Sequence, residues 1–395
     1  RGRRRVFLWG MVLNTLSTLA CALAPDAAVL IAARVLQGAG SAMIFGTGTA
    51  ILISVYPLRQ RGRVLGITVA TVYLGLSVGP FAGGLLTQGL GWRSVFFTVV
   101  PLGVLAVSLT LVCMKGEWAD ARDEKFDLPG SLIFSLGLAL TMYGLSLVPS
   151  LAGALLLAAG FAALAVFVYW ELRAAFPVLD IRLFKTNPVF ALSNLSALIN
   201  YSATFAVTFL MSLYLQYIKD MSPREAGIVM VSQPLVMALF SPLAGRLSDR
   251  LEPRLVASLG MALTALGLCF CVFLENGTGI AYVVACLLTL GLGFAFFSSP
   301  NTNAVMSSVE RRHYGLASGT VGTMRLSGQM FSMGIATMIL ALYVGRNKIT
   351  PELFAAYLHA QKTAYVFFAL LCAVGVFTSV FRGRVRQPGT EAARG

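Results

Sequence analysis

The sequence predicts an all-α polytopic membrane protein with about twelve transmembrane helices, on three observations. Of its 395 residues, 57% are hydrophobic and only 12% are charged, whereas soluble domains carry about 25% charged residues. The mean hydropathy is +0.80. About twelve apolar runs follow one another along the chain, each close to the roughly 20 residues that a membrane helix needs. These observations exclude an ordinary soluble enzyme and a disordered chain.

The apolar runs are separated by turn residues or by charges. The first break is Pro25-Asp26, later ones are 89–93 and 275–279, and all of them carry Gly, Pro or charged residues. Runs longer than about 25 residues predict tilted helices. In order, the predicted helices are 6–23, 27–56, 64–87, 95–113, 128–148, 151–170, 188–218, 226–244, 255–274, 280–306, 316–344 and 363–381.

The two longest polar stretches, 115–127 and 172–187, divide the chain. They flank two runs that are joined by a very short turn. We therefore expect an N-terminal helix bundle in residues 1–113, a two-helix insert with its linkers in residues 114–187, and a C-terminal six-helix bundle with a basic tail in residues 188–395.

The formal net charge of +14 predicts a topology. The basic residues punctuate the apolar runs instead of forming one face, so nucleic acid is not expected as a partner. Twenty-two of the 30 Lys and Arg residues fall on one side of the predicted membrane and six on the other. By the positive-inside rule the first side, which includes the C-terminal tail, is cytoplasmic. We expect a multi-pass protein of the cell membrane whose main partner is the lipid bilayer.

Neither a metal nor a cofactor is expected. The six cysteines lie within or at the ends of apolar runs, no C-x-x-C occurs, and the chain has two histidines. The pattern G-x-x-x-x-G-K-[ST], which binds nucleotide phosphates, is also absent. An enzyme is not expected, because no set of nucleophile and base or of metal ligands is apparent.

Arg34 and Arg325 are the charged residues that lie inside apolar runs. At about 1.5 Å per residue they lie about 10 and 14 Å deep. An arginine near the membrane centre costs about 2.5–3.5 kcal/mol on insertion scales, and a guanidinium does not readily lose its proton. We therefore predict a functional role for both, by pairing with a carboxylate, by holding an anionic substrate group or by tuning a nearby acid. Snorkelling of the side chain to the membrane surface is the alternative.

Glycines recur every fourth residue at Gly75, Gly79 and Gly83, beside Pro80 and Gly84. Such a stripe lets another helix approach closely, and proline bends a helix. From the residues alone, the stripe is as consistent with a gate seal as with ordinary small-residue packing.

A charged turn, Gly245 to Arg250 with Asp249, is expected at a cytoplasmic helix end. Its carboxylate can cap a neighbouring helix N-terminus and pair with arginine across the bundle interface, as a latch. A solvated turn is the alternative.

Polar residues inside the runs are candidates for a substrate lining. They are Asn14, Tyr73, Asn194, Asn200, Asn301 and Gln329. Some of them are expected to form hydrogen bonds between helices instead.

Taken together, these motifs resemble the major facilitator superfamily over essentially the whole chain. Residues 30–42, LIAARVLQGAGSA, resemble its fourth-helix motif and add Gln37 to Arg34 as a coupling residue. Residues 75–84 resemble its fifth-helix antiporter motif, and this resemblance favours the gate seal for the glycine stripe. Residues 245–254 resemble its loop motif. Residues 2–5, GRRR, resemble the tail of the same loop motif and add Arg3 and Arg4 to the latch. Residues 92–103 are similar to the sixth-helix start of the fourteen-helix drug:proton antiporters.

The resemblance implies a two-bundle fold and an N-terminally truncated chain that lacks its first two helices. It also implies that the carboxylate which couples transport to protons lies in that segment, because all sixteen acids present are in loops or near helix ends.

The expected function is proton-coupled efflux of hydrophobic or amphipathic compounds by alternating access, with the proton gradient as energy source. Transport of a specific anionic metabolite is the first alternative, and a non-transporting membrane sensor is the second. Whether a periplasmic adaptor extends the export route is left open.

Overall fold

The computed structural model describes residues 2–118, 127–148, 150–174, 177, 179, 181–345 and 349–383, and this part of the chain contains helices and turns without a strand. Within these residues, twelve helical segments are long and apolar enough to cross a membrane, which confirms the predicted fold class. The helices are α1 (Arg3–Leu23), α2 (Ala27–Val55), α3 (Arg61–Leu90), α4 (Arg93–Cys113), α5 (Leu128–Leu147), α6 (Leu151–Glu171), α7 (Ile181–Thr186), α8 (Pro188–Leu213), α9 (Pro223–Met230), α10 (Ser232–Arg250), α11 (Pro253–Val272), α12 (Ile280–Ser307), α13 (Tyr314–Tyr343) and α14 (Phe354–Phe381). Single turns are η1 (Leu58–Gln60), η2 (Tyr214–Ile218), η3 (Arg311–His313) and η4 (Pro351–Leu353).

Short polar side chains set the starts of several helices. The Asp26 carboxylate accepts a hydrogen bond from the Val29 amide at 2.9 Å at the start of α2. Ser150 and Asn187 cap α6 and α8 in the same way. Each of these oxygens satisfies one backbone N–H that has no partner within its helix. The turn residues that separate the apolar runs therefore also begin the helices.

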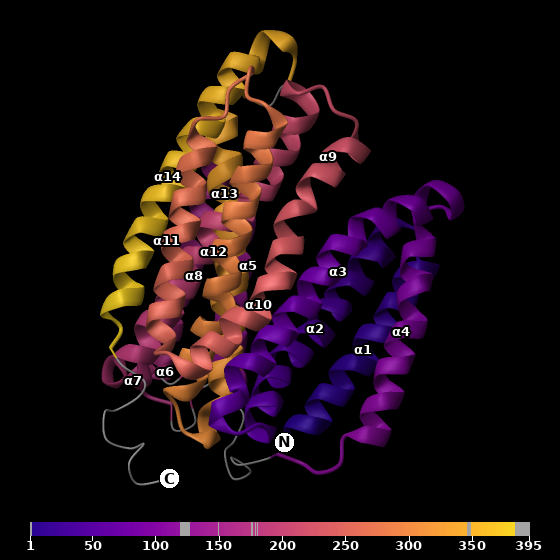
Figure 1. Ribbon diagram of the computed structural model, residues 1–395. Helices are drawn as coiled ribbons and strands as arrows, with labels where there is room; N and C mark the ends of the chain where they lie inside the picture. The colour runs from indigo at the N-terminus through magenta and orange to yellow at the C-terminus, as the bar shows by residue number, and fades with distance from the viewer. Residues whose placement is uncertain are drawn as a thin grey trace.

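Two predicted runs are interrupted in the structure. The run 188–218 ends in η2, which is one turn of π-helix after α8. The run 226–244 falls on two helices, α9 and α10, that meet at Val231. Both interruptions lie toward the same end of the C-terminal helices (Figure 1).

The membrane helices form two bundles. In the N-terminal bundle, α1 packs against α2 and α4; in the C-terminal bundle, α11 packs against α12 and α14, and α8 against α13 and α14. The bundles lie side by side where α1 begins and α14 ends, and they diverge toward the opposite end (Figure 1). The first of these ends also holds η1, the end of α10 and η3, and we call it the basic end because of its arginines.

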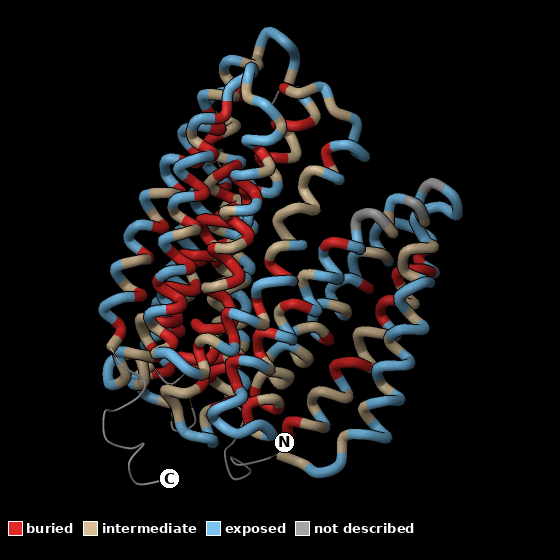
Figure 2. Tube along the Cα trace, viewed as in Figure 1, coloured by how far each residue is buried: buried red, intermediate tan, exposed pale blue. Residues whose placement is uncertain are grey.

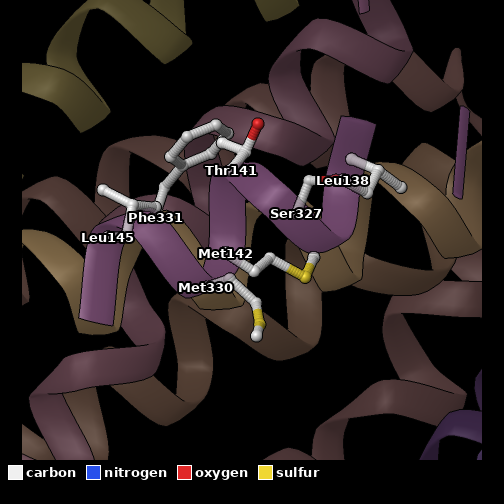
Figure 3. A pocket seen from close by; sticks show the side chains of 7 residues that line it. All are labelled: Leu138, Thr141, Met142, Leu145, Ser327, Met330 and Phe331. Atoms are coloured by element: carbon white, nitrogen blue, oxygen red, sulfur yellow. The ribbon is translucent and has the colours of Figure 1, made fainter. Parts of the chain in front are cut away.

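Helices α5 and α6 form a pair outside the two bundles. They pack against each other, and α5 also contacts α13. Leu145 of α5 lies over Gly334 of α13, where a Cβ would meet the leucine side chain at 3.1 Å. A small apolar crevice beside this contact is lined by Leu138, Thr141, Met142 and Leu145 from α5 and by Ser327, Met330 and Phe331 from α13 (Figure 3).

Burial differs between the two bundles. Buried residues gather in the C-terminal bundle, whereas the N-terminal helices are mostly exposed or half-buried (Figure 2). Every residue of α4 is exposed or half-buried. Large apolar side chains such as Leu109 and Val112 therefore point outward, which suits a lipid environment, where apolar surface needs no cover.

Candidate functional site

Asp249 joins the two bundles at the basic end. It lies in the last turn of α10, and its carboxylate accepts hydrogen bonds from the backbone N–H groups of Gly62 at 2.7 Å and Arg63 at 2.8 Å. These are among the first N–H groups of α3, which lack partners within the helix and carry its partial positive charge. The carboxylate therefore caps a helix that belongs to the opposite bundle.

Glycines bring α3 and α10 into close contact at the same place. A Cβ added at Gly245 would meet the carbonyl oxygen of Gly62, and one added at Gly66 would meet the carbonyl oxygen of Ser241. In both cases the obstacle is backbone, which cannot rotate away. The close approach of the two helices therefore depends on these small residues.

Arg3 makes a second bridge across the basic end. Its guanidinium donates to the Ser54 hydroxyl at 3.0 Å in α2 and to the carbonyl oxygen of Arg311 at 2.9 Å on the side of the C-terminal bundle. The side chain is buried. It also lies 6.0 Å from the centre of the Tyr314 ring, which Arg61 approaches to 5.3 Å. Two arginines of the N-terminal bundle thus share one aromatic ring of α13.

The other two predicted latch residues have different positions. Arg4 is held through its backbone N–H, which donates to the Glu117 carboxylate at 2.9 Å. Arg250 is exposed at the end of α10. Asp249, Arg3 and the glycines are among the residues whose contacts join the bundles here.

An apolar cluster fills the interface beside these polar contacts. It combines residues of α2 and α3 with residues of α8, α12 and α13, and all of its central members are buried. These members are Ala50, Ile53, Leu65, Phe190, Val305, Met306, Tyr314 and Ala317. The basic end is therefore closed by buried apolar packing as well as by hydrogen bonds.

The glycine stripe has the opposite environment. A Cβ added at Gly75, Gly79, Gly83 or Gly84 would meet no other described atom within 4 Å. These residues lie in the second half of α3, where the bundles diverge (Figure 1). The Pro80 backbone continues the helix, and its side chain lies outside the described part of the chain. The predicted seal is thus unpacked in this conformation.

Arg34 belongs to a network within the N-terminal bundle. Its guanidinium donates to the Gln37 side-chain oxygen at 2.8 Å and lies 4.9 Å from the centre of the Phe96 ring. Gln37 donates in turn to the Thr18 hydroxyl at 2.7 Å. Asn14 donates to the Gln37 carbonyl oxygen and to the Ser41 hydroxyl. The Arg34 side chain is exposed, so the network orients a charge without burying it.

Arg325 lies at the interface itself. Its guanidinium is 4.6 Å from the centre of the Phe45 ring, which places α13 of the C-terminal bundle against α2 of the N-terminal bundle. A cation–π contact is worth about 2 kcal/mol when desolvated. It thus offsets only part of the roughly 2.5–3.5 kcal/mol that a central membrane arginine costs.

Three aromatic side chains lie at the same depth as Arg325. Tyr73 of α3 and Tyr201 of α8 both meet the Phe294 ring of α12 edge to face, with ring centres 5.7 and 5.3 Å apart. Tyr73 is also near enough to Arg325 to interact with its charge. The helical rise of about 1.5 Å per residue puts all of these residues about 15–20 Å from the basic ends of their helices. They form a mid-membrane layer shared by both bundles.

Three of the other predicted lining residues pack within the C-terminal bundle and not at the bundle interface. Asn194, Asn200 and Asn301 are buried inside the C-terminal bundle, where their amides donate to the Phe190 carbonyl oxygen, the Met261 sulfur and the Ser193 carbonyl oxygen. Asn14 serves the Arg34 network. Gln329 is half-buried in α13. Of the predicted lining, Tyr73 is the residue that the structure places at the bundle interface.

Comparison with known proteins assigns the family. The sequence profile of the Major Facilitator Superfamily matches residues 1–193 and again residues 193–395. The chain belongs to the Major Facilitator Superfamily. It is therefore a transporter of that superfamily and not an enzyme.

Its relatives include transporters of different compounds. The chain is 29% identical over 385 residues to the riboflavin transporter RibZ of Clostridioides difficile, covering 96% of this chain and 83% of RibZ. It is 32% identical over 358 residues to the multidrug resistance protein Stp of Mycobacterium tuberculosis, covering 89% of this chain and 66% of Stp. The fold is similar to that of the human organic anion transporter MFSD10, with a TM-score of 0.66 at 15% identity, covering 96% of this chain and 77% of that one.

Several functional residues were missed by reasoning from the sequence. Gly62 and Gly66 could be recognised only once their partner α10 was known. Phe45 and Phe294 look like ordinary apolar packing residues in a membrane helix. Their signal is their common depth relative to Arg325, which can be read only after the helices are aligned with one another.

Proposed function

We propose that this transporter exports amphipathic compounds from the cytoplasm by alternating access, driven by proton entry, and that it is of the fourteen-helix drug:proton antiporter type. The single observation that carries alternating access is the contrast between the two ends of α3. Its first turns are capped and tightly packed against α10, while a Cβ added at any glycine of its stripe would meet no described atom within 4 Å. Alternating access requires two such seals, closed in turn.

The charge distribution supports the orientation. The arginines of η1, α10 and η3 gather at the basic end, which the positive-inside rule puts in the cytoplasm together with the C-terminus of α14. In this orientation the structure is closed to the cytoplasm and represents an outward-facing state. The location in the cell membrane and the export direction belong to the proposal.

Known relatives support the substrate class. Stp is named as a multidrug resistance protein, and a methylenomycin A resistance protein of Streptomyces coelicolor is 31% identical over 354 residues, covering 87% of this chain and 72% of that protein. Resistance by a membrane protein of this superfamily is consistent with removal of the compound from the cell. Proton coupling is drawn from the sequence resemblance to antiporters.

A flux measurement tests the proposal. The full-length protein is reconstituted into proteoliposomes that contain a pH-sensitive dye and carry an imposed pH gradient. We expect an amphipathic substrate to move against the proton flow, and a protonophore to abolish this movement. Gly245→Leu, which disrupts the α3–α10 contact, is expected to stop transport. Flux that is independent of the gradient would refute proton coupling, and no flux of any tested compound would favour a membrane sensor.

A further inference from the structure

The mid-membrane layer carries a positive charge that its own helices do not balance. The helices that meet there are α2, α3, α8, α12 and α13, and their sequences contain neither Asp nor Glu. Arg325 therefore has no carboxylate within this layer, and the group that it faces at 4.6 Å is the Phe45 ring. A ring contributes a quadrupole and not a full negative charge.

The residues around this charge remain accessible. Arg325 and Tyr73 are half-buried, and the Phe45 side chain is 48% exposed although it contacts a guanidinium. Phe45 therefore has free ring surface beside the charge. An incoming molecule can reach the guanidinium and this ring surface together.

The walls of the layer are aromatic and come from both bundles. Tyr73 is on the N-terminal side, and Phe294 and Tyr201 are on the C-terminal side, with the phenylalanine held edge to face by both tyrosines. Aromatic faces and edges favour a planar ring in offset or perpendicular contact. The tyrosine hydroxyls of this layer add donors for an oxygen atom of the same ligand.

We propose that the transported compound is an aromatic anion, whose negative group pairs with Arg325 and whose ring packs against Phe45 and the Tyr73–Phe294–Tyr201 wall. The inference rests on the proposed function, since it names the class of compound that the transporter moves. A cation would be repelled by Arg325, and a neutral ring would leave the guanidinium unpaired. Because Phe45 and Tyr73 belong to one bundle and Arg325, Phe294 and Tyr201 to the other, such a ligand would be held by both.

Binding to the full-length protein in lipid nanodiscs, measured by calorimetry, tests this assignment. Four probes separate charge from ring: 2-naphthoate, the neutral 2-naphthylmethanol, the cationic 2-naphthylmethylammonium and the non-aromatic cyclohexanecarboxylate. We expect 2-naphthoate to bind most tightly. Arg325→Gln should weaken 2-naphthoate by about tenfold or more, the scale of a lost charge-assisted hydrogen bond, and leave 2-naphthylmethanol within about twofold. Arg312→Gln, at an exposed arginine of the basic end, is the matched control and should change neither.

Two further variants keep the test decisive if Arg325→Gln does not fold. Arg325→Lys retains the positive charge. This variant should therefore bind 2-naphthoate more tightly than it binds cyclohexanecarboxylate, the anionic probe that has no aromatic ring. Phe45→Leu should weaken 2-naphthoate more than cyclohexanecarboxylate. Equal or tighter binding of the cationic probe, or 2-naphthoate affinity that does not depend on Arg325, would overturn the inference.

The result is separable from that of the flux measurement. Binding in nanodiscs needs neither a proton gradient nor a transport cycle. Arg325-dependent binding of the anion without gradient-driven flux would contradict the proposed function and leave this inference standing. Gradient-driven flux of a cationic compound without binding of 2-naphthoate would contradict this inference and leave the proposed function standing.

Discussion

Removing the Asp249 carboxylate should open the basic end. In Asp249→Ala the N–H groups of Gly62 and Arg63 lose their acceptor, and each hydrogen bond to a charged group is worth about 1.5–3 kcal/mol. Asp249 is half-buried and Arg63 is exposed, so water replaces part of this energy. We expect the closed state to lose about 2 kcal/mol, which shifts the closed-to-open equilibrium about thirtyfold, since about 1.4 kcal/mol is a factor of ten.

Cysteine accessibility measures this shift. Ala50 is fully buried in the apolar cluster that closes the basic end, so Ala50→Cys, in a chain whose six native cysteines have been replaced, reports opening. Its rate of modification by a membrane-permeable maleimide should rise by up to about thirtyfold when Asp249→Ala is added, as expected for a group that reacts only in the open state.

A matched control separates the latch from helix capping in general. Asp26 also caps a helix, with a hydrogen bond of 2.9 Å from Val29, but within one bundle and at the opposite end. Asp26→Ala should leave the labelling rate of the Ala50→Cys reporter unchanged. The reasoning fails if Asp249→Ala does not raise the labelling rate, or if Asp26→Ala raises it equally.

Two other predictions concern packing. Gly245→Ala should raise the labelling rate of the Ala50→Cys reporter, because the new Cβ meets the backbone of Gly62. Gly79→Ala should leave this rate unchanged, because its Cβ meets no described atom. Equal effects of the two variants would contradict the difference between the two ends of α3. Arg382→Ala should lower thermal stability in detergent, by about 1–3 kcal/mol, because the buried Arg382 guanidinium donates to Asn301 at 2.6 Å and Ser193 at 3.2 Å and its loss strands the Asn301 oxygen. A melting temperature equal to that of the unmodified protein would count against this second prediction.

The membrane helices were predictable because lipid imposes a strong constraint. A span must be about 20 residues long and apolar, since backbone polar groups have to be paired within the helix. Most of the predicted runs therefore coincide with single helices, whereas 188–218 and 226–244 are interrupted. Asp249 was also predicted as a capping residue, with a solvated turn as the alternative, since a carboxylate is stabilised by the N–H groups at a helix N-terminus.

The direction in which a polar side chain points was not predictable. An asparagine in an apolar helix has the same sequence signal whether it faces a cavity or a neighbouring helix. Asn194, Asn200 and Asn301 turn out to be buried within one bundle. Arg382 is one of the 22 basic residues on the predicted cytoplasmic side, and its side chain is fully buried. Such differences depend on how helices pack, which a single sequence does not contain.

Opposite movement of the two ends is the central claim, and electron spin distance measurements test it most directly. One spin-label pair replaces Leu58 and Leu251 at the basic end, and the other replaces Leu90 and Ile228 at the opposite end; all four side chains are exposed. Under conditions of transport, alternating access predicts a second population in which the distance between the first pair is longer and that between the second pair is shorter. Distances that stay fixed, or that lengthen and shorten together, would contradict the account.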